Sequence, residues 1–323
     1  MPILRRTILL AILSLGVVAL SAGRSAMAAE KLNIVTTVGM IADVAERIGG
    51  ERVEIVNLIG EGVDPHSYWQ TRSDVVKMGR ADAILANGLY LEAQLEELLL
   101  KFKEKKPVYF VGEVIEVDER RASETYNDRY DPHVWMSPRL WRKVALGIRD
   151  ALGELDPEGR AVFEENTNAY LAEMDALDAY ARKVIASIPA NQRILITAHD
   201  AFGYLGRDYD IEVLGVQGIS TQSEAGLQRV EELVDLIVER DVKAVFVESS
   251  VSERNVRALV EGAAARGHQV EIGGLLYSDA MGKPGTYEGT YIGMLDHNTT
   301  RIARALGGDA PERGMQDKLG AGL

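Results

Sequence analysis

The chain has 323 residues, no cysteine and a formal net charge of −13 at pH 7. The lack of cysteine excludes disulfides, thiolate metal sites and a lipid-modified N-terminal cysteine. The acidic balance disfavours nucleic acid as a partner, because binding to phosphates requires a basic surface.

The first 28 residues are predicted to be a secretory signal peptide. Arg5 and Arg6 precede an apolar run over residues 8–20, and small residues then lead to an Ala-x-Ala pattern that ends at Ala28. The apolar run is too short to span a bilayer, so a retained membrane anchor is the weaker interpretation. We expect cleavage after Ala28 and export to the periplasm.

Residues 29–155 are predicted to form an N-terminal α/β lobe. Apolar, β-rich runs at 32–38, 53–58, 83–86 and 108–111 alternate with helical patterns at 40–48, 73–78, 91–102 and 138–152. Alternation of strands and helices is typical of a parallel sheet with helices on both faces.

Residues 156–188 are predicted to form one long amphipathic helix. Apolar side chains recur at helical spacing, and no strong helix breaker follows Pro157 until Pro189. Such a helix would be much longer than a typical globular helix. A coiled coil is the alternative, but one isolated heptad stretch is short for that. We therefore interpret this segment as a rigid helix that joins two lobes.

Residues 189–308 repeat the alternating pattern and are predicted to form a C-terminal α/β lobe. Its strands are expected at 194–197, 213–216, 244–247 and 270–272, and its helices at 224–239, 254–265 and 291–306. The glycine-rich, charged segment 309–323 is predicted to be a flexible tail. The fold class is thus α/β, with two mostly parallel sheets flanked by helices and joined by one long rigid helix.

An Asp-Pro-His phrase occurs twice, ending at His66 and at His133. Proline fixes its own φ and biases the preceding residue toward extended backbone, so each phrase holds an imidazole on a stiff loop. Imidazoles held in this way suit a metal ion. Both phrases precede the predicted long helix, so they supply one half of a site.

The other half is expected from the C-terminal lobe. His199 directly follows one predicted strand and Asp279 follows another, and in parallel sheets ligands collect beyond the carboxyl ends of the strands. His66, His133, His199 and Asp279 would then close a four-ligand site in a cleft between the lobes. From its own position alone, Asp279 is no stronger a candidate for the fourth ligand than the other loop acids, which are Asp200, Asp210 and Asp296. The other two histidines are interpreted as a turn residue, His268, and a helix-surface residue, His297.

Several phrases together resemble the TroA-like metal-binding subunits of ABC importers. They are the Asp-Pro-His pair and the segments 197–204, 215–220, 247–250 and 273–282. The resemblance covers essentially the whole mature chain. It implies two α/β lobes joined by one rigid helix, and metal ligands at His66, His133, His199 and Asp279. It also implies a partner permease in the inner membrane, driven by an ATPase.

The third ligand bears on which metal is bound. Family members assigned to manganese or iron usually have Glu where this chain has His199, and imidazole suits Zn²⁺ whereas carboxylate suits the harder Mn²⁺. The zinc-dedicated branch, however, often carries a His-rich loop, and residues 113–130 contain no histidine. We expect Zn²⁺ as the transported ligand, with Mn²⁺ as the alternative.

The leading hypothesis is a monomeric, non-enzymatic binding protein that captures a divalent metal and delivers it to the permease. Two other hypotheses remain open. A zinc metallohydrolase would need an open coordination position and a general base, and the chain has no His-Glu-x-x-His motif. A surface adhesin would bind its partner without need of His66.

Acidic and aromatic residues near the histidines are candidates for supporting roles. Asp64, Asp131 and Glu248 are possible partners for the second ring nitrogens of the ligand histidines, although each could equally cap a turn. Tyr68, Trp69 and Trp135 are candidates to wall off the cleft.

Overall fold

The computed structural model describes residues 31–123 and 129–320, so the predicted signal peptide lies outside the described residues. The first four strands form one parallel sheet in the order β2-β1-β3-β4. They are β1 (Leu32–Val38), β2 (Val53–Ile59), β3 (Ala83–Ala86) and β4 (Val108–Phe110). All four strands occur where the sequence predicts them, because each is a mostly apolar run rich in β-branched or aromatic side chains, which suits a sheet covered on both faces.

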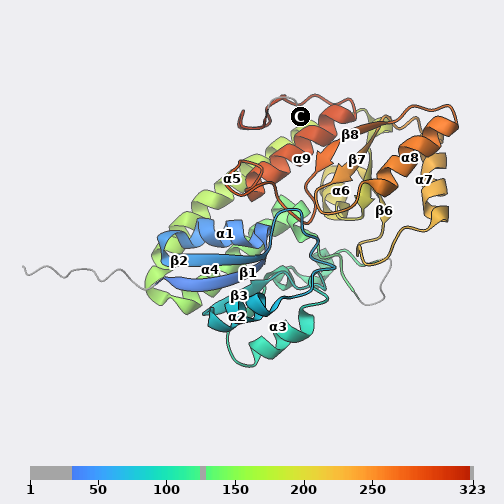
Figure 1. Cartoon of the computed structure of the whole chain (residues 1–323). Helices are drawn as coiled ribbons and strands as arrows, with labels where there is room; N and C mark the ends of the chain where they lie inside the picture. Colours follow the sequence, from blue (N-terminus) through green and yellow to red (C-terminus); the bar gives the residue numbers. More distant parts are fainter. Residues whose placement is uncertain (1–30, 124–128, 321–323) are drawn as a thin grey trace, which may run out of the picture. The chain divides into compact units, whose positions relative to one another are not determined.

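Helices cover both faces of this sheet (Figure 1). They are α1 (Gly39–Gly49), α2 (Arg72–Arg80), α3 (Glu96–Lys103) and α4 (Pro138–Leu155). In Figure 1, α1 lies above the sheet and α2 and α3 lie below it, and α1 packs against α4. The Ser137 hydroxyl accepts the N–H of Leu140 at 3.2 Å and Pro138 opens the first turn, so α4 begins directly after the segment of His133.

Helix α3 is shorter than its sequence pattern predicts, beginning at Glu96 instead of Leu91. Leu89 and Tyr90 have positive φ values of 53° and 70°, so the chain turns here before the helix can begin. The buried carboxylate of Glu92 accepts the backbone N–H groups of Asn87 and Gly88 and stabilises this turn. The apolar residues at 91, 95 and 99 are buried as the pattern predicts, but the first two lie in the turn that precedes the helix.

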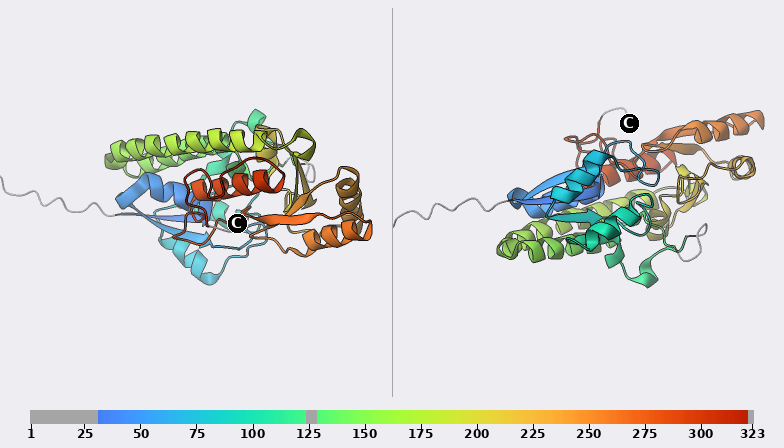
Figure 2. Two further views of the ribbon diagram at one scale, coloured as in Figure 1. Left: turned by 90° about the horizontal axis from the view of Figure 1, so that it is seen from above. Right: turned by 60° about the horizontal axis from the view of Figure 1, so that its bottom comes forward.

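The long central helix is α5 (Arg160–Ala186), preceded by a 3-10 turn at Pro157–Gly159. Its 27 residues span about 40 Å. The apolar row that predicted it is buried, from Phe163 to Val184. Helix α5 packs against α1 and α4 of the first half and against α6 (Gly203–Tyr209) and α9 (Tyr291–Ala305) of the second. Figure 2 shows α5 and α9 running alongside each other.

The second half of the chain builds two pairs of parallel strands, β5-β6 and β7-β8, with β5 beside β7. The strands are β5 (Ile194–His199), β6 (Glu212–Gln217), β7 (Ala244–Glu248) and β8 (Glu271–Leu276). Helices α7 (Leu227–Glu239) and α8 (Arg254–Ala265) pack against each other at the outer side (Figure 1). The predicted α/β class with parallel sheets, flanking helices and one long helix is confirmed.

Two clusters of buried side chains hold these elements together. The larger one runs from the first sheet through α4, α5 and α9 and reaches Phe202 and Phe246 of the second half. The smaller one lies among β5, β7, α7 and α8. Because the larger cluster includes residues from both halves, the loops beyond β2, β5 and β8 are held close to one another.

Three features of the second half differ from the expectations or extend them. The short helix α6 was not predicted, since seven residues give too little periodicity. His297 lies in α9 but is buried, not on the helix surface, and its ring is hydrogen-bonded to the carbonyl of Leu275 at 2.9 Å. Strand β8 extends to Leu276, beyond the predicted end, although Gly273 and Gly274 interrupt its apolar pattern.

The described part of the predicted flexible tail, residues 309–320, lies against α9. Leu319 is buried, and the backbone N–H of Met315 donates to the carboxylate of Asp296. These contacts place the segment on the molecule, and its mobility stays a prediction. Within residues 31–123 and 129–320, none of the helices combines the length and the apolar character that crossing a membrane requires.

Candidate metal centre

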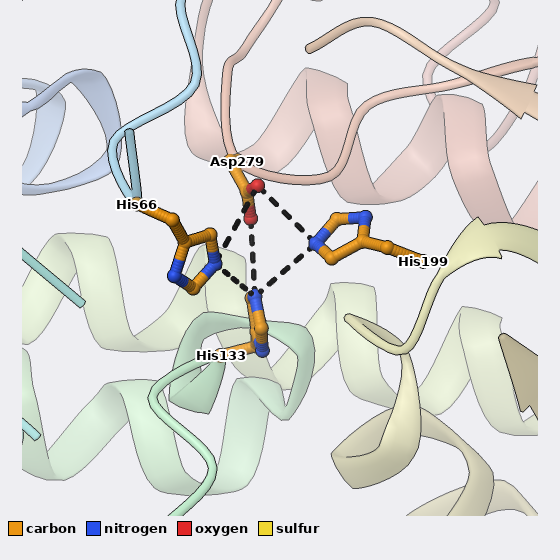
Figure 3. Close-up of side chains that lie close together, drawn as sticks. All are labelled: His66, His133, His199 and Asp279. Carbon is orange, nitrogen blue, oxygen red and sulfur yellow. Dashed lines mark hydrogen bonds and ion pairs between the residues drawn. The ribbon is translucent and has the colours of Figure 1, made fainter. Parts of the chain in front are cut away.

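The structure brings together all four residues that the sequence predicts as metal ligands. His66 lies in the loop after β2, and His133 immediately precedes the 3-10 turn Val134–Met136 that leads into α4. His199 is the last residue of β5, and Asp279 lies in the loop after β8. Figure 3 shows the three rings and the carboxylate pointing toward one another. The potential ligand atoms all lie within 4.8 Å of each other.

The spacing of these atoms matches a tetrahedral metal site. Nε2 of His133 is 3.2 Å from Nε2 of His66 and 3.4 Å from Nε2 of His199. The Asp279 carboxylate lies 3.2 Å from Nε2 of His133, 3.2 Å from Nε2 of His199 and 3.9 Å from Nε2 of His66. Ligands at about 2.0–2.2 Å from a tetrahedral Zn²⁺ are themselves about 3.3–3.6 Å apart. Four of these five separations are close to the ligand spacing of such a coordination shell, and the distance from His66 to Asp279 is somewhat longer.

The four side chains are shielded from bulk solvent. His133 and His199 are 0% exposed, and His66 and Asp279 are each 2% exposed. Oδ1 of Asp279 lies 3.2 Å from Nε2 of His133, and Oδ2 lies 3.2 Å from Nε2 of His199. A buried carboxylate is costly unless a positive charge or a donor faces it, and a bound cation would supply such a charge.

Two of the three rings are held by buried carboxylates. Nδ1 of His133 is 2.7 Å from Oδ1 of Asp131, which also accepts the backbone N–H of His133 at 2.9 Å. Nδ1 of His199 is 2.5 Å from Oε2 of Glu248, whose Oε1 accepts the backbone N–H of His199 at 2.7 Å. A carboxylate on Nδ1 selects the tautomer that leaves Nε2 free to bind a metal. Two of the three candidate supporting acids are thus in the expected place.

The third acid, Asp64, caps a turn instead. Its Oδ1 accepts the backbone N–H of His66 at 2.8 Å, and its Oδ2 accepts the hydroxyls of Ser67 at 2.9 Å and Thr221 at 2.6 Å. Gln222 donates to the backbone carbonyl of His66 at 2.8 Å. The His66 loop is therefore fixed through its backbone and through the 221–222 segment, a contact that no sequence pattern indicated.

The protonation of the three rings differs with their surroundings. Burial lowers the pKa of His66 to about 4, against an opposing effect of the Asp279 charge. Burial would also lower the pKa of His133, but Asp131 and Asp279 raise it to about 9. In the same way Glu248 and Asp279 outweigh burial at His199 and raise its pKa well above the usual value. The two imidazolium groups hold the pKa of Asp279 well below its usual range, although burial acts to raise it.

Aromatic side chains contribute unequally to the walls of the site. Trp135 is fully buried, and its ring meets the ring of His133 edge to face at 5.3 Å. Tyr68 is partly buried and donates to Asp74 at 2.7 Å. Trp69 is 68% exposed, so the expectation that it walls off the cleft is wrong.

The competing acids and histidines of the second half lie outside the cluster. Asp296 binds the tail at Met315, and Asp210 is exposed near Arg193. The ring of His268 is hydrogen-bonded to the carbonyl of Val242 at 2.9 Å, next to the turn after α8. Asp200 adjoins His199 but is not in the cluster of ligand atoms. The choice of Asp279 from the sequence therefore agrees with the geometry.

This combination of fold and site defines the class. A parallel α/β chain with one long central helix and a buried cluster of three imidazoles and one carboxylate is a metal-binding subunit of an ABC importer. The chain belongs to the ZnuA family, described as zinc-uptake complex component A, periplasmic, which matches residues 34–305. The resemblance inferred from the sequence motifs is thereby confirmed, and the family is one of transporter binding proteins.

Individual relatives are similar to this chain over most of their length. The chain is 46% identical to the manganese-binding lipoprotein MntA of Bacillus subtilis (strain 168), over 88% of this chain and 92% of MntA. It is 45% identical to the zinc-binding protein TroA of Treponema pallidum (strain Nichols), over 88% of this chain and 91% of TroA. The solved structure of periplasmic zinc-binding TroA from Treponema pallidum has a TM-score of 0.83 to this chain, with 45% identity, and covers 85% of this chain and 99% of TroA.

Proposed function

We propose that this protein captures Zn²⁺ in the periplasm with His66, His133, His199 and Asp279 and delivers it to an ABC permease for uptake. The observation that carries the proposal is the convergence of four buried side chains whose potential ligand atoms all lie within 4.8 Å of one another. The carboxylates on Nδ1 of His133 and His199 support it, because such partners orient imidazoles for metal binding.

The donor set favours zinc over manganese. Three imidazoles and one carboxylate suit a tetrahedral Zn²⁺, whereas Mn²⁺ prefers six ligands that are mostly oxygen. The relatives themselves divide, since MntA is described as manganese-binding and TroA as zinc-binding. Zinc is therefore proposed on the chemistry of this site, with manganese as the alternative.

The proposed route begins with removal of residues 1–28 as a signal peptide. The mature chain then has lobes at 29–155 and 189–308, joined by 156–188, and acts as a monomer that meets a permease driven by an ATPase. Helix α5 packs against helices of both halves, so release is expected through a small tilt or a loop shift rather than wide opening.

The test is metal analysis of the protein purified without added metal, followed by zinc and manganese titrations. Wild type should bind one equivalent of zinc, and His133→Ala should lose more than about 100-fold in affinity, since loss of an outer partner alone costs about 10–100-fold. His199→Glu should move the preference toward manganese.

His268→Ala provides the matched control, because it removes an imidazole that lies outside the cluster. It should bind zinc like wild type. Zinc should also raise the melting temperature of wild type, because a ligand that binds only the folded state stabilises it. The proposal is wrong if wild type binds neither ion, or if His133→Ala binds zinc as tightly as His268→Ala does.

A further inference from the structure

Trp135 connects the segments that carry two of the four proposed ligands. It lies two residues after His133, and its indole N–H donates to the carbonyl of Ser278 at 2.9 Å, across 143 positions of the chain. Ser278 directly precedes Asp279, and both Trp135 and Ser278 are 0% exposed. One buried hydrogen bond therefore joins the backbone beside Asp279 to the segment of His133.

A second hydrogen bond joins the other end of the Asp279 segment to the same tryptophan. Tyr291, the first residue of α9, donates its hydroxyl to the backbone carbonyl of Trp135 at 2.9 Å. Its backbone N–H donates to the carboxylate of Asp43 on α1 at 3.1 Å. The segment 278–291 is thus attached at both ends to Trp135, although Asp279 itself belongs to the second half of the sequence.

These two contacts bear directly on the spacing of the metal site. The distance from Oδ1 of Asp279 to Nε2 of His133 is 3.2 Å, one edge of the tetrahedral cluster. The Trp135 ring also packs edge to face against the His133 ring, so it restrains the imidazole that lies opposite Asp279. A metal site must hold its ligands within about 0.5 Å of the productive geometry. Because Trp135 contacts the segments of both Asp279 and His133, it limits how far these two ligands can move apart, and this limit affects which ions fit.

We propose that Trp135 is a positioning residue that holds Asp279 against His133 and thereby sets the preference for a small tetrahedral ion over a larger six-coordinate one. This inference rests on the proposed metal-binding function. It assigns the selectivity to a residue that contacts no metal and to a hydrogen bond whose loss leaves a buried carbonyl unpaired. Loosening that edge admits longer bonds and additional water ligands, which favour Mn²⁺ relative to Zn²⁺.

The test compares Trp135→Phe with Trp141→Phe. Phenylalanine at 135 keeps an aromatic ring but removes the N–H. Trp141 is an equally buried tryptophan whose ring lies 6.4 Å from that of Trp135, and in the described part of the chain its Nε1 has no hydrogen-bond partner. The pair therefore separates loss of the hydrogen bond from loss of indole volume in the same aromatic core.

For Trp135→Phe we expect zinc affinity to fall by about 10-fold or more, the lower end of the range for an outer partner, and the ratio of zinc to manganese affinity to fall with it. The visible absorption spectrum of the Co²⁺-loaded protein should change, because it reports coordination geometry. Trp141→Phe should keep both the affinity ratio and the Co²⁺ spectrum of wild type. Tyr291→Phe removes the hydrogen bond from the Tyr291 hydroxyl to the Trp135 carbonyl without altering Trp135. It should change the affinity ratio and the Co²⁺ spectrum in the same direction as Trp135→Phe, but by less.

Two results overturn the inference while leaving metal binding by wild type intact. One is a Trp135→Phe variant with the affinity ratio and Co²⁺ spectrum of wild type. The other is an equal change in Trp141→Phe, which would assign the effect to core packing. If Trp135→Phe does not fold, an unchanged ratio in Tyr291→Phe overturns it. Failure of wild type to bind zinc or manganese would instead contradict the proposed function itself.

Discussion

The three histidines of the metal centre are held in two different ways. The rings of His133 and His199 each have a buried carboxylate on Nδ1, and the same carboxylate also accepts the backbone N–H of that histidine. At His66 only the backbone is held in this way, and among the described residues no carboxylate is hydrogen-bonded to its Nδ1. Two imidazoles are therefore oriented before a metal arrives, and the third depends on its loop.

The same difference appears in how the surrounding segments are fixed. His199 ends a buried strand and His133 leads into the long helix α4, whereas His66 lies in a loop whose neighbour Trp69 is 68% exposed. That loop is attached to the second half through Thr221 and Gln222. We therefore expect release of the metal to begin at His66, whose ring has no carboxylate hydrogen-bonded to Nδ1 among the described residues.

The largest expected effect comes from proton binding, which differs between His66 and the two histidines that have a carboxylate on Nδ1. With a pKa of about 4, His66 is neutral at pH 7 and has no proton to lose. With a pKa raised to about 9, His133 is protonated there, and a metal ion must displace that proton to reach Nε2. Zinc affinity should therefore rise with pH, by about 100-fold between pH 6 and pH 8 for each proton that the metal displaces.

Zinc titration calorimetry in two buffers of different protonation enthalpy measures the protons released. At pH 7 we expect release of at least one proton, since the pKa of His199 is also raised. Affinity that does not vary between pH 6 and pH 8 would contradict the assignment of a protonated His133.

Removal of the carboxylates should give the next largest effect. Glu248→Ala and Asp131→Ala should each lower zinc affinity by about 10–100-fold, because they free the orientation and tautomer of His199 and His133. Asp64→Ala is the comparison variant and should lose less affinity, since Asp64 binds the backbone of His66 and the Thr221 hydroxyl but not the histidine ring. Competition titrations with a zinc chelator measure all three, and equal losses in the three variants would remove the distinction between the histidines.

The smallest effect is expected at the loop contact. Thr221→Val keeps the shape of the side chain but removes the hydroxyl that donates to Asp64 at 2.6 Å. A hydrogen bond typically contributes about 0.5–1.5 kcal/mol, so zinc release should become about 2–10-fold faster. Thr286→Val, which removes a hydroxyl donating to Lys283 away from the site, should leave the rate unchanged. Stopped-flow mixing with excess chelator measures both, and an unchanged rate in Thr221→Val would show that this contact does not retain the metal.

Much of the fold follows from local pattern. The strands β1 to β4 and the helix α5 are marked in the sequence by apolar side chains, most of which are buried or partly buried. Two helical features are different. Helix α6 has seven residues, and the shortened start of α3 depends on positive φ values at Leu89 and Tyr90, which their residue types do not suggest.

The spacing of apolar residues in the sequence also did not predict the surroundings of single polar side chains. His297 has the spacing of a surface position, yet α9 is packed on α5 and β8 so that almost all of this helix is enclosed. Asp64 and Asp131 occupy the same position in the duplicated phrase, but only Asp131 reaches the ring of its histidine. The two phrases enter different tertiary surroundings, and identical local sequence cannot record that difference.

The sequence by itself determined which side chains are available for a metal, because two Asp-Pro-His phrases and two strand-end residues are local features of the chain. It also determined that the site must be completed from both halves, since His66 and His133 precede α5 and His199 and Asp279 follow it. Only the tertiary structure decided the separations of 3.2 to 3.9 Å, the carboxylates on two of the rings and the tie from Trp135 to Ser278. These depend on contacts between segments as far apart in the chain as those of His66 and Asp279, and such contacts are set by the packing of the whole core.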